Sequence, residues 1–223
     1  MITESRSFIL NPFKSKSKMK YLIFSLFILI TLNQQAQTSQ KYNFGFEDQK
    51  EDQELPQGWG GYGNLEVSVS SVAKSGKKSG KISSFEDSEG SGNGALLYRF
   101  PANYKGDTLK LEGYMKIEGV KNGFAGLFLR VDGVGKPLAF DNMEDENING
   151  TRDWKKYTIS VNFPDNAKYL IVGGILLGDG TAWFDDFTLS IDGKNIQNLK
   201  EIEKKEAKAK LDTEFDNGPF IDK

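Results

Sequence analysis

Two adjacent carboxylates, Asp185 and Asp186, have the clearest chemical potential in this chain, within the segment 183–189, Trp-Phe-Asp-Asp-Phe-Thr-Leu. Side chains alternate between the two faces of a strand, so the pattern predicts that Asp185 shares an apolar face with Trp183 and Phe187. An ionised carboxylate on such a face is costly unless it is paired or bound to a cation. Asp186 is predicted on the opposite face, so the two carboxylates cannot flank one glycosidic bond. The pair therefore predicts a structural ion site or a polar end of a sandwich, and not a reaction.

The composition excludes most of the common kinds of catalytic site. The chain has 223 residues, with no Cys and no His. Without Cys there is no disulfide, no thiolate nucleophile and no zinc site built on Cys, and without His a Ser-His-Asp triad is excluded. The Gly-rich segments 58–61 and 90–94 lack the Lys-Ser/Thr pair of a phosphate-binding loop and are predicted to be turns. We therefore predict that this chain is not an enzyme and has no organic cofactor.

A second set of candidates could bind a ligand without reacting with it. Trp59 lies in a Gly-rich stretch and, together with Tyr62, could offer an exposed ring for stacking against a sugar. Arg130, Asp141 and Asn142 could supply polar contacts on a concave face of a sheet. The alternative is that the aromatic side chains belong to the core and that the polar side chains are solvated.

The first 37 residues have the pattern of a secretory signal peptide. Four lysines between positions 14 and 20 precede the apolar run 21–32, YLIFSLFILITL, and a polar stretch ends near Gln37. The run is shorter than the ~20 residues of a transmembrane helix, so we predict cleavage and no stable membrane insertion, with an uncleaved anchor as the alternative. Residues 1–18 are either an over-extended start before Met19 or a long basic region. The chain is predicted to be exported to the periplasm, the outer surface or the medium.

Cleavage would make the chain more acidic. Residues 1–37 carry one Glu, one Arg and four Lys, a net +4, so the formal charge would change from −2 to −6. An acidic chain is a poor candidate for binding nucleic acid. No nucleic-acid partner is therefore predicted.

Residues 38–195 are predicted to form a single all-β domain. Short apolar or alternating segments are separated by Gly, Asn, Asp and Pro, which is typical of an antiparallel sandwich or barrel. About eight or nine strands are expected, at 43–47, 65–69, 81–83, 95–100, 109–117, 124–131, 154–163, 169–177 and 183–191. Residues 196–223, rich in Lys, Glu and Ala, predict a charged helical or disordered linker, with Glu201 and Lys205 at i,i+4 spacing.

Four short motifs occur in a fixed order: Asn-Phe-Gly-Phe-Glu (43–47), Leu-Pro-x-Gly-Trp (55–59), Ser-Gly-Lys-Lys-Ser (75–79) and Trp-x-Asp-Asp-Phe (183–187). This set resembles a galactose-binding-like jelly roll of the carbohydrate-binding-module type. With the segments 131–133, 138–143 and 148–157, the chain is similar to an N-terminal accessory domain of exported Bacteroidetes proteins, where it precedes a tail-specific serine peptidase domain. The segment 207–218 resembles the connector into that domain, whose Ser/Lys catalytic pair has no counterpart here.

The resemblance implies a structural Ca²⁺ shared by the first and last strands. Glu47 and either Asp185 or Asp186 would be ligands, with carbonyl oxygens from Ser75–Lys78 completing the shell. Calcium takes 6–8 oxygen ligands and tolerates irregular loops. The alternative is that these carboxylates pair with Lys or cap a turn.

The expected function is that of a non-catalytic exported accessory module. It would bind a glycan or position a peptidase domain of the same parent protein. Two alternatives stand beside this expectation: a fragment of a tail-specific serine peptidase without its catalytic domain, and a stand-alone structural protein of the periplasm or cell surface.

Overall fold

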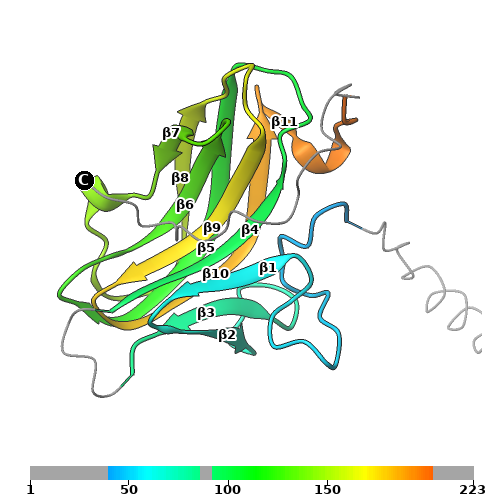
Figure 1. Ribbon diagram of the computed structural model, residues 1–223. Helices are drawn as coiled ribbons and strands as arrows, with labels where there is room; N and C mark the ends of the chain where they lie inside the picture. The colour runs from blue at the N-terminus through cyan, green and yellow to red at the C-terminus, as the bar shows by residue number, and fades with distance from the viewer. Residues whose placement is uncertain (1–39, 86–91, 203–223) are drawn as a thin grey trace, which may run out of the picture. The chain divides into compact units, whose positions relative to one another are not determined.

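The computed structural model describes residues 40–85 and 92–202 (Figure 1). The chain divides into two compact units, Met1–Gln40 and Lys41–Lys223, and the first lies outside the described residues except for Gln40. The predicted signal peptide, with its apolar run 21–32, therefore falls outside the description. Within the described ranges, no helix is long and apolar enough to cross a membrane.

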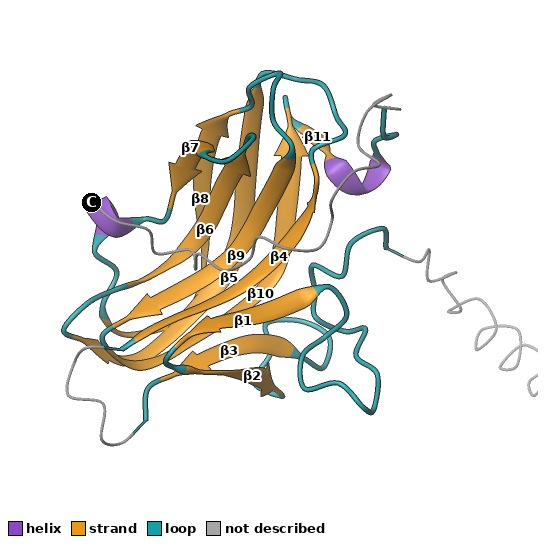
Figure 2. Cartoon of the chain, in the orientation of Figure 1, coloured by secondary structure: helices purple, strands orange, loops and turns teal. Residues whose placement is uncertain are grey.

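Two antiparallel sheets contain nearly all of the regular structure (Figure 2). In spatial order, the five-stranded sheet consists of β1 (Trp59–Gly63), β4 (Asn93–Pro101), β9 (Tyr169–Leu177), β6 (Ala125–Asp132) and β7 (Pro137–Asp141). The six-stranded sheet consists of β2 (Glu66–Ser70), β3 (Ser79–Ser83), β10 (Asp179–Ile191), β5 (Thr108–Lys121) and β8 (Gly150–Asn162), with the short β11 (Lys194–Asn195) paired to β10. Two 3-10 turns complete the described elements, η1 (Glu144–Glu146) and η2 (Ile196–Asn198). The predicted all-β antiparallel jelly-roll sandwich is confirmed.

The core lies between the two sheets, and the long strands reach it by simple alternation. In β5, Leu109, Leu111 and Met115 face the core and are at most 1% exposed, whereas Lys110 and Glu112 between them point to the other side. In β9 and β6, buried leucines and valines meet them from the opposite sheet. Burial of each such side chain contributes roughly 1.5–3 kcal/mol, so this cysteine-free domain is stabilised by its apolar core.

The prediction of a first strand at 43–47 is wrong. These residues form turns, and Phe46 has a left-handed φ of 62°. Phe44 and Phe46 are nevertheless almost fully buried, at 1% and 0% exposure. The segment therefore contributes side chains to the core without pairing in a sheet.

Strands β1, β7 and β11 were not predicted. The sequence of β1, Trp-Gly-Gly-Tyr-Gly, has the composition of a turn, yet it pairs with β4 from Trp59↔Tyr98 to Gly63↔Gly94. Gly61 explains part of the composition, because a Cβ there would lie 2.9 Å from the Cβ of Val67. A larger residue would push β1 away from β2 at this edge of the sandwich.

A β-bulge in β10 changes the predicted faces of the segment 183–189. Asp185 and Thr188 are three positions apart, but their partners in β5 are only two positions apart, so β10 holds one extra residue. That residue is Asp186, whose φ of 50° is left-handed. The bulge frees the N–H of Phe187, which donates to the carbonyl of Phe44 at 3.1 Å. The last long strand thereby ties down the buried N-terminal segment.

As a result, Phe184 and Phe187 both face the core, with their rings stacked 6.4 Å apart. Trp183 and Asp185 point to the opposite, outer side of the six-stranded sheet, where Trp183 pairs with Lys81 and Lys116. The prediction that Asp185 shares an apolar face with Phe187 is therefore wrong. A bulge depends on the partner strand and leaves no mark in the alternation of the sequence.

The domain continues beyond the predicted boundary at residue 195. Ile196 is fully buried, Leu199 packs against the core, and the N–H of Ile202 donates to the carbonyl of Asn103 at 2.9 Å. Residues 199–202 are not helical. The rest of the predicted linker, 203–223, lies outside the described residues.

Candidate functional site

The predicted metal ligands meet at one loop, residues 74–78, which precedes β3. Both oxygens of Asp185 accept backbone hydrogen bonds: Oδ2 from the N–H groups of Lys74 (2.8 Å) and Ser75 (3.1 Å), and Oδ1 from that of Asp186 (2.7 Å). Glu47 reaches the same loop from the N-terminal segment, and its Oε1 accepts from the N–H groups of Lys77 and Lys78 at 2.8 and 2.9 Å. The loop thus joins the start of the domain to its last long strand.

Two further contacts define this loop. The hydroxyl of Ser75 donates to Oδ1 of Asp186 at 2.7 Å. Gly76 adopts a left-handed φ of 63°, and a Cβ there would lie 2.2 Å from Oε1 of Glu47. Glycine is therefore required both by the backbone conformation and by the close approach of the carboxylate. We call Glu47, Asp185, Asp186 and residues 74–78 the carboxylate clasp.

The clasp contains one perturbed acid. Asp185 is completely buried, and this burial raises its pKa to about 6, against the lowering effect of the three backbone hydrogen bonds that it accepts. Its carboxylate is held by amides rather than by a lysine, so the alternative expectation of a Lys partner is not what the structure shows.

The donor set does not fit a calcium ion in this arrangement. Calcium needs six to eight oxygen ligands, whereas the oxygens of Glu47 and Asp185 are directed at N–H groups of the loop. Among the residues that the structure describes, no three acidic side chains are grouped closely enough to hold a metal ion. The calcium site stays a prediction, and it would require the loop amides to turn away from the carboxylates.

Trp59 is not an exposed ring. Its indole is 7% exposed, lies 4.3 Å from the ring of Phe46 and 5.6 Å from that of Phe187, and donates through Nε1 to the carbonyl of Asn43 at 2.7 Å. The Gly-rich stretch that was predicted to be a turn is part of strand β1, which directs Trp59 into the core. Trp154, on β8, is half-buried.

The other ligand candidates do not converge on one site. Tyr62 and Arg130 both point to the outer side of the five-stranded sheet, on β1 and β6, which are separated by two strands. Arg130 is half-buried and forms a two-point ion pair with Asp132, at 2.8 and 2.9 Å. Asp141 and Asn142 are used locally, because their side chains accept from the N–H groups of Met143 and Glu144 ahead of η1.

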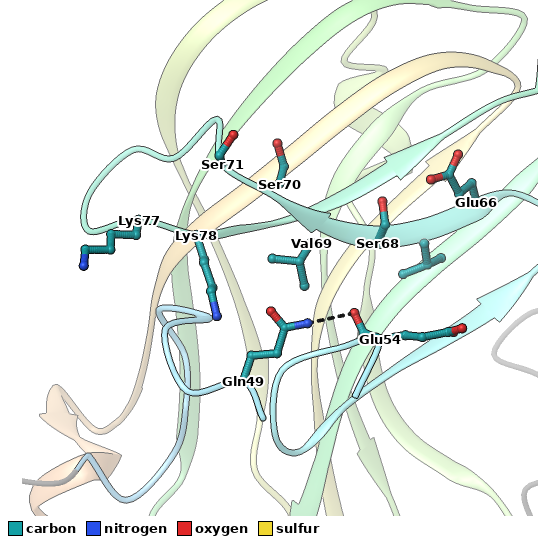
Figure 3. Close-up of a pocket in the computed structure, with 10 residues that line it drawn as sticks. Gln49, Glu54, Glu66, Ser68, Val69, Ser70, Ser71, Lys77 and Lys78 are labelled. Carbon is teal, nitrogen blue, oxygen red and sulfur yellow. Dashed lines mark hydrogen bonds between the residues drawn. The ribbon is translucent and has the colours of Figure 1, made fainter. Parts of the chain in front are cut away.

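A groove of about 660 Å³ lies beside β2, an edge strand of the six-stranded sheet (Figure 3). It is lined by residues from three separate segments: Gln49, Glu54, Glu66, Val67, Ser68, Val69, Ser70, Ser71, Lys77 and Lys78. Figure 3 shows Lys78 extending toward Gln49, with Glu54 and Glu66 at the other end of the groove. We call this the β2 groove. Sequence reasoning missed it because its walls are far apart in the chain.

One wall of the β2 groove is fixed by local hydrogen bonds. The side-chain amide of Gln49 donates to the carbonyls of Gln53 and Glu54, at 2.8 and 3.1 Å, which closes the segment 49–54 into a compact loop. Lys78 is fixed at its backbone by Glu47 of the carboxylate clasp. The clasp therefore positions one end of the groove, and this link gives the motif Ser-Gly-Lys-Lys-Ser a structural role.

Sequence comparison gives one partial relative. No family model matches the chain. The chain is 35% identical over 114 residues to a Bacillus subtilis (strain 168) protein described as the uncharacterized HTH-type transcriptional regulator YbfP. This match covers 48% of the chain and 38% of that protein. The chain thus spans well under half the length of this curated relative.

Solved structures with similar folds include several carbohydrate-binding modules. They include the CBM22-1 xylan-binding domain of Paenibacillus barcinonensis Xyn10C (TM-score 0.45, 16% identity, 66% of this chain and 91% of that one). The module TmCBM61, solved with β-1,4-galactotriose, has a TM-score of 0.43 at 16% identity and covers 67% and 95% of the two chains. A xylan-binding domain from CBM 22 has a TM-score of 0.44 at 16% identity, with coverage of 71% and 98%.

Proposed function

We propose that this chain is a non-catalytic carbohydrate-binding module and that the β2 groove is where the glycan binds. The observation that carries the proposal is the groove itself. Its volume of about 660 Å³ falls within the range of roughly 300–1,000 Å³ typical of small-molecule sites. The chemistry of the groove lining supports the proposal.

The lining suits a sugar because it combines donors, acceptors and an apolar floor. Serine hydroxyls on β2 can both donate and accept, the ammonium of Lys78 donates, and the carboxylates of Glu54 and Glu66 accept. Val67 and Val69 provide apolar surface between them. A saccharide presents hydroxyl groups around its edge and C–H groups on its faces, so it can use each of these.

A glycan array probed with the intact chain tests the proposal. Ser68→Tyr would fill the groove from the edge strand, whereas Ser160→Tyr adds the same side chain at an exposed position of β8. We expect the wild type and the Ser160 variant to bind the same glycans, and the Ser68 variant to lose that binding. Absence of binding to any glycan, or equal binding by both variants, would refute the proposal.

A second role, positioning an adjoining domain, is favoured by the way the two ends of the domain are joined. Lys41 forms an ion pair with Glu201 at 2.8 Å, and Tyr42 exchanges two hydrogen bonds with the side chain of Gln197, at 2.9 and 2.8 Å. A domain attached after residue 202 would start from a fixed point. The peptidase resemblance would supply such a domain, and a peptidase reading frame continuing past the codon for Lys223 would support this role; a frame without one would count against it.

Export is part of the proposal, supported by the signal-peptide pattern of residues 1–37. N-terminal sequencing of the protein recovered outside the cytoplasm is expected to start close to Thr38. Recovery of a chain that still begins at Met1 or Met19 would contradict cleavage.

A further inference from the structure

The two ends of the β2 groove carry opposite charge. The last residue of β2, Ser70, pairs with Ser79 of β3. Lys77 and Lys78 directly precede Ser79, so they lie at this end of the groove. Glu66, the first residue of β2, lies at the opposite end, as Figure 3 also shows. The groove is therefore polarised along β2, with a lysine end and a glutamate end.

The ammonium groups at the lysine end have no carboxylate partner. Within residues 40–85 and 92–202, neither Lys77 nor Lys78 takes part in an ion pair. The nearby carboxylate of Glu47 accepts from their backbone N–H groups, at 2.8 and 2.9 Å, and not from their ammonium groups. Lys78 is also half-buried, and an anion supplied by a ligand would compensate the partial loss of water around its charge.

The distance along β2 decides which charge an arriving anion meets. Glu66 and Ser70 are four residues apart in an extended strand, which corresponds to about 14 Å. Interactions between exposed charges are largely screened beyond about 8 Å at physiological ionic strength. An anion at the lysine end is therefore attracted by Lys77 and Lys78 more strongly than it is repelled by Glu66.

We propose that the β2 groove takes an acidic saccharide whose anionic group pairs with Lys78, with Lys77 adding to the positive charge at that end. The carboxylate of a uronic acid or a sulfate ester would supply this group. The hydroxyls of Ser68 and Ser70 would bind sugar hydroxyls along the strand, and Glu66 would accept from a neutral sugar at the other end. The inference rests on the proposed function, because it names the class of glycan for the same groove.

A panel of matched glycans, probed with the intact chain, tests this inference. Each acidic oligosaccharide is paired with a neutral form, made by reducing its uronic acids or by removing its sulfate esters, so the two arms show which anionic group is bound. We expect at least one acidic member to bind about tenfold or more tightly than its neutral form, which corresponds to one hydrogen bond to a charged group. Poly-glutamate, an anion without sugar rings, should not bind.

Variants of single lysines locate the anionic group. Lys78→Gln removes the charge but keeps the backbone N–H that binds Glu47, and it should abolish most of the preference for the acidic form. Lys77→Gln, at an exposed neighbouring position, should reduce this preference to a smaller extent. Lys136→Gln makes the same change at an exposed position between β6 and β7 and should leave the preference unchanged. Circular dichroism checks that each variant is folded.

The possible results separate this inference from the proposed function. Equal affinity for the acidic and neutral forms, or an unchanged preference in the Lys78→Gln variant, would overturn the acidic class and leave glycan binding in the β2 groove standing. Binding of poly-glutamate as tight as that of the best saccharide would also overturn it. Loss of binding across the whole panel would refute the proposed function, and this inference with it.

Discussion

Replacement of Trp59 by alanine tests whether this side chain belongs to the core or binds a ligand, the two roles that the sequence left open. The side chain is 7% exposed and stacks on Phe46 at 4.3 Å and on Phe187 at 5.6 Å. Removing a buried tryptophan costs about 3–5 kcal/mol. Loss of the Nε1 hydrogen bond leaves the carbonyl of Asn43 without this donor and adds about 1 kcal/mol. We expect the free energy of unfolding to fall by about 4–6 kcal/mol.

Urea denaturation followed by far-ultraviolet circular dichroism measures this without relying on tryptophan fluorescence. Trp154→Ala is the matched control, since the same side chain is only half-buried on β8 and should cost about 1 kcal/mol. Trp59→Phe keeps the stacking and should cost about 1–2 kcal/mol, mainly from the lost hydrogen bond. Equal losses for the two alanine variants, or a loss below about 1 kcal/mol for Trp59→Ala, would refute the core assignment.

Three further predictions concern the carboxylate clasp. Because burial raises the pKa of Asp185 to about 6, the folded chain binds this proton more tightly than the unfolded chain, so the stability linked to it is present below pH 4 and is lost as the pH rises through 6. Relative to the Asp185→Asn variant, the wild type should therefore lose about 2 kcal/mol of unfolding free energy between pH 4 and pH 7, measured by urea titrations. A difference between the two proteins that stays constant with pH would contradict this. Gly76→Ala should lower the free energy of unfolding by at least about 1 kcal/mol, because it combines a left-handed backbone with a clash against Glu47, and an unchanged midpoint in urea would show that the loop is not clamped. Thermal melting should be the same with calcium and with a chelator if amides hold the clasp, and a chelator-induced drop would restore the calcium prediction.

The alternation of apolar and polar residues predicted the fold well, because one face of each long strand is buried in the core. Strands β5 and β9 appear almost where their apolar residues indicated, and the antiparallel sandwich follows from their number and spacing. Strand β1 was not predicted because its glycines allow close packing against β2 rather than forming a turn. The strand predicted at 43–47 was wrong for the opposite reason, because its alternating phenylalanines have the pattern of a strand but reach the core from turns.

The candidate site was predicted only in part. The resemblance implied that Glu47, Asp185 or Asp186 and the loop 75–78 lie close together, and the structure places them in contact, but the direction of the contacts depends on backbone geometry that residue types do not encode. The left-handed φ of Asp186 that creates the bulge is an example. The β2 groove could not be predicted, because its lining from 49–54, 66–71 and 77–78 is assembled by the topology of two sheets.

Chemical-shift mapping of a bound glycan tests the central claim most directly. An oligosaccharide identified on the array would be titrated into the ¹⁵N-labelled chain. The account predicts saturable shifts concentrated on the backbone amides of Ser68, Ser70 and Lys78 and on the side-chain amide of Gln49, all of which line the β2 groove. Shifts confined to the outer side of the five-stranded sheet, or no saturable shift with any glycan, would contradict it.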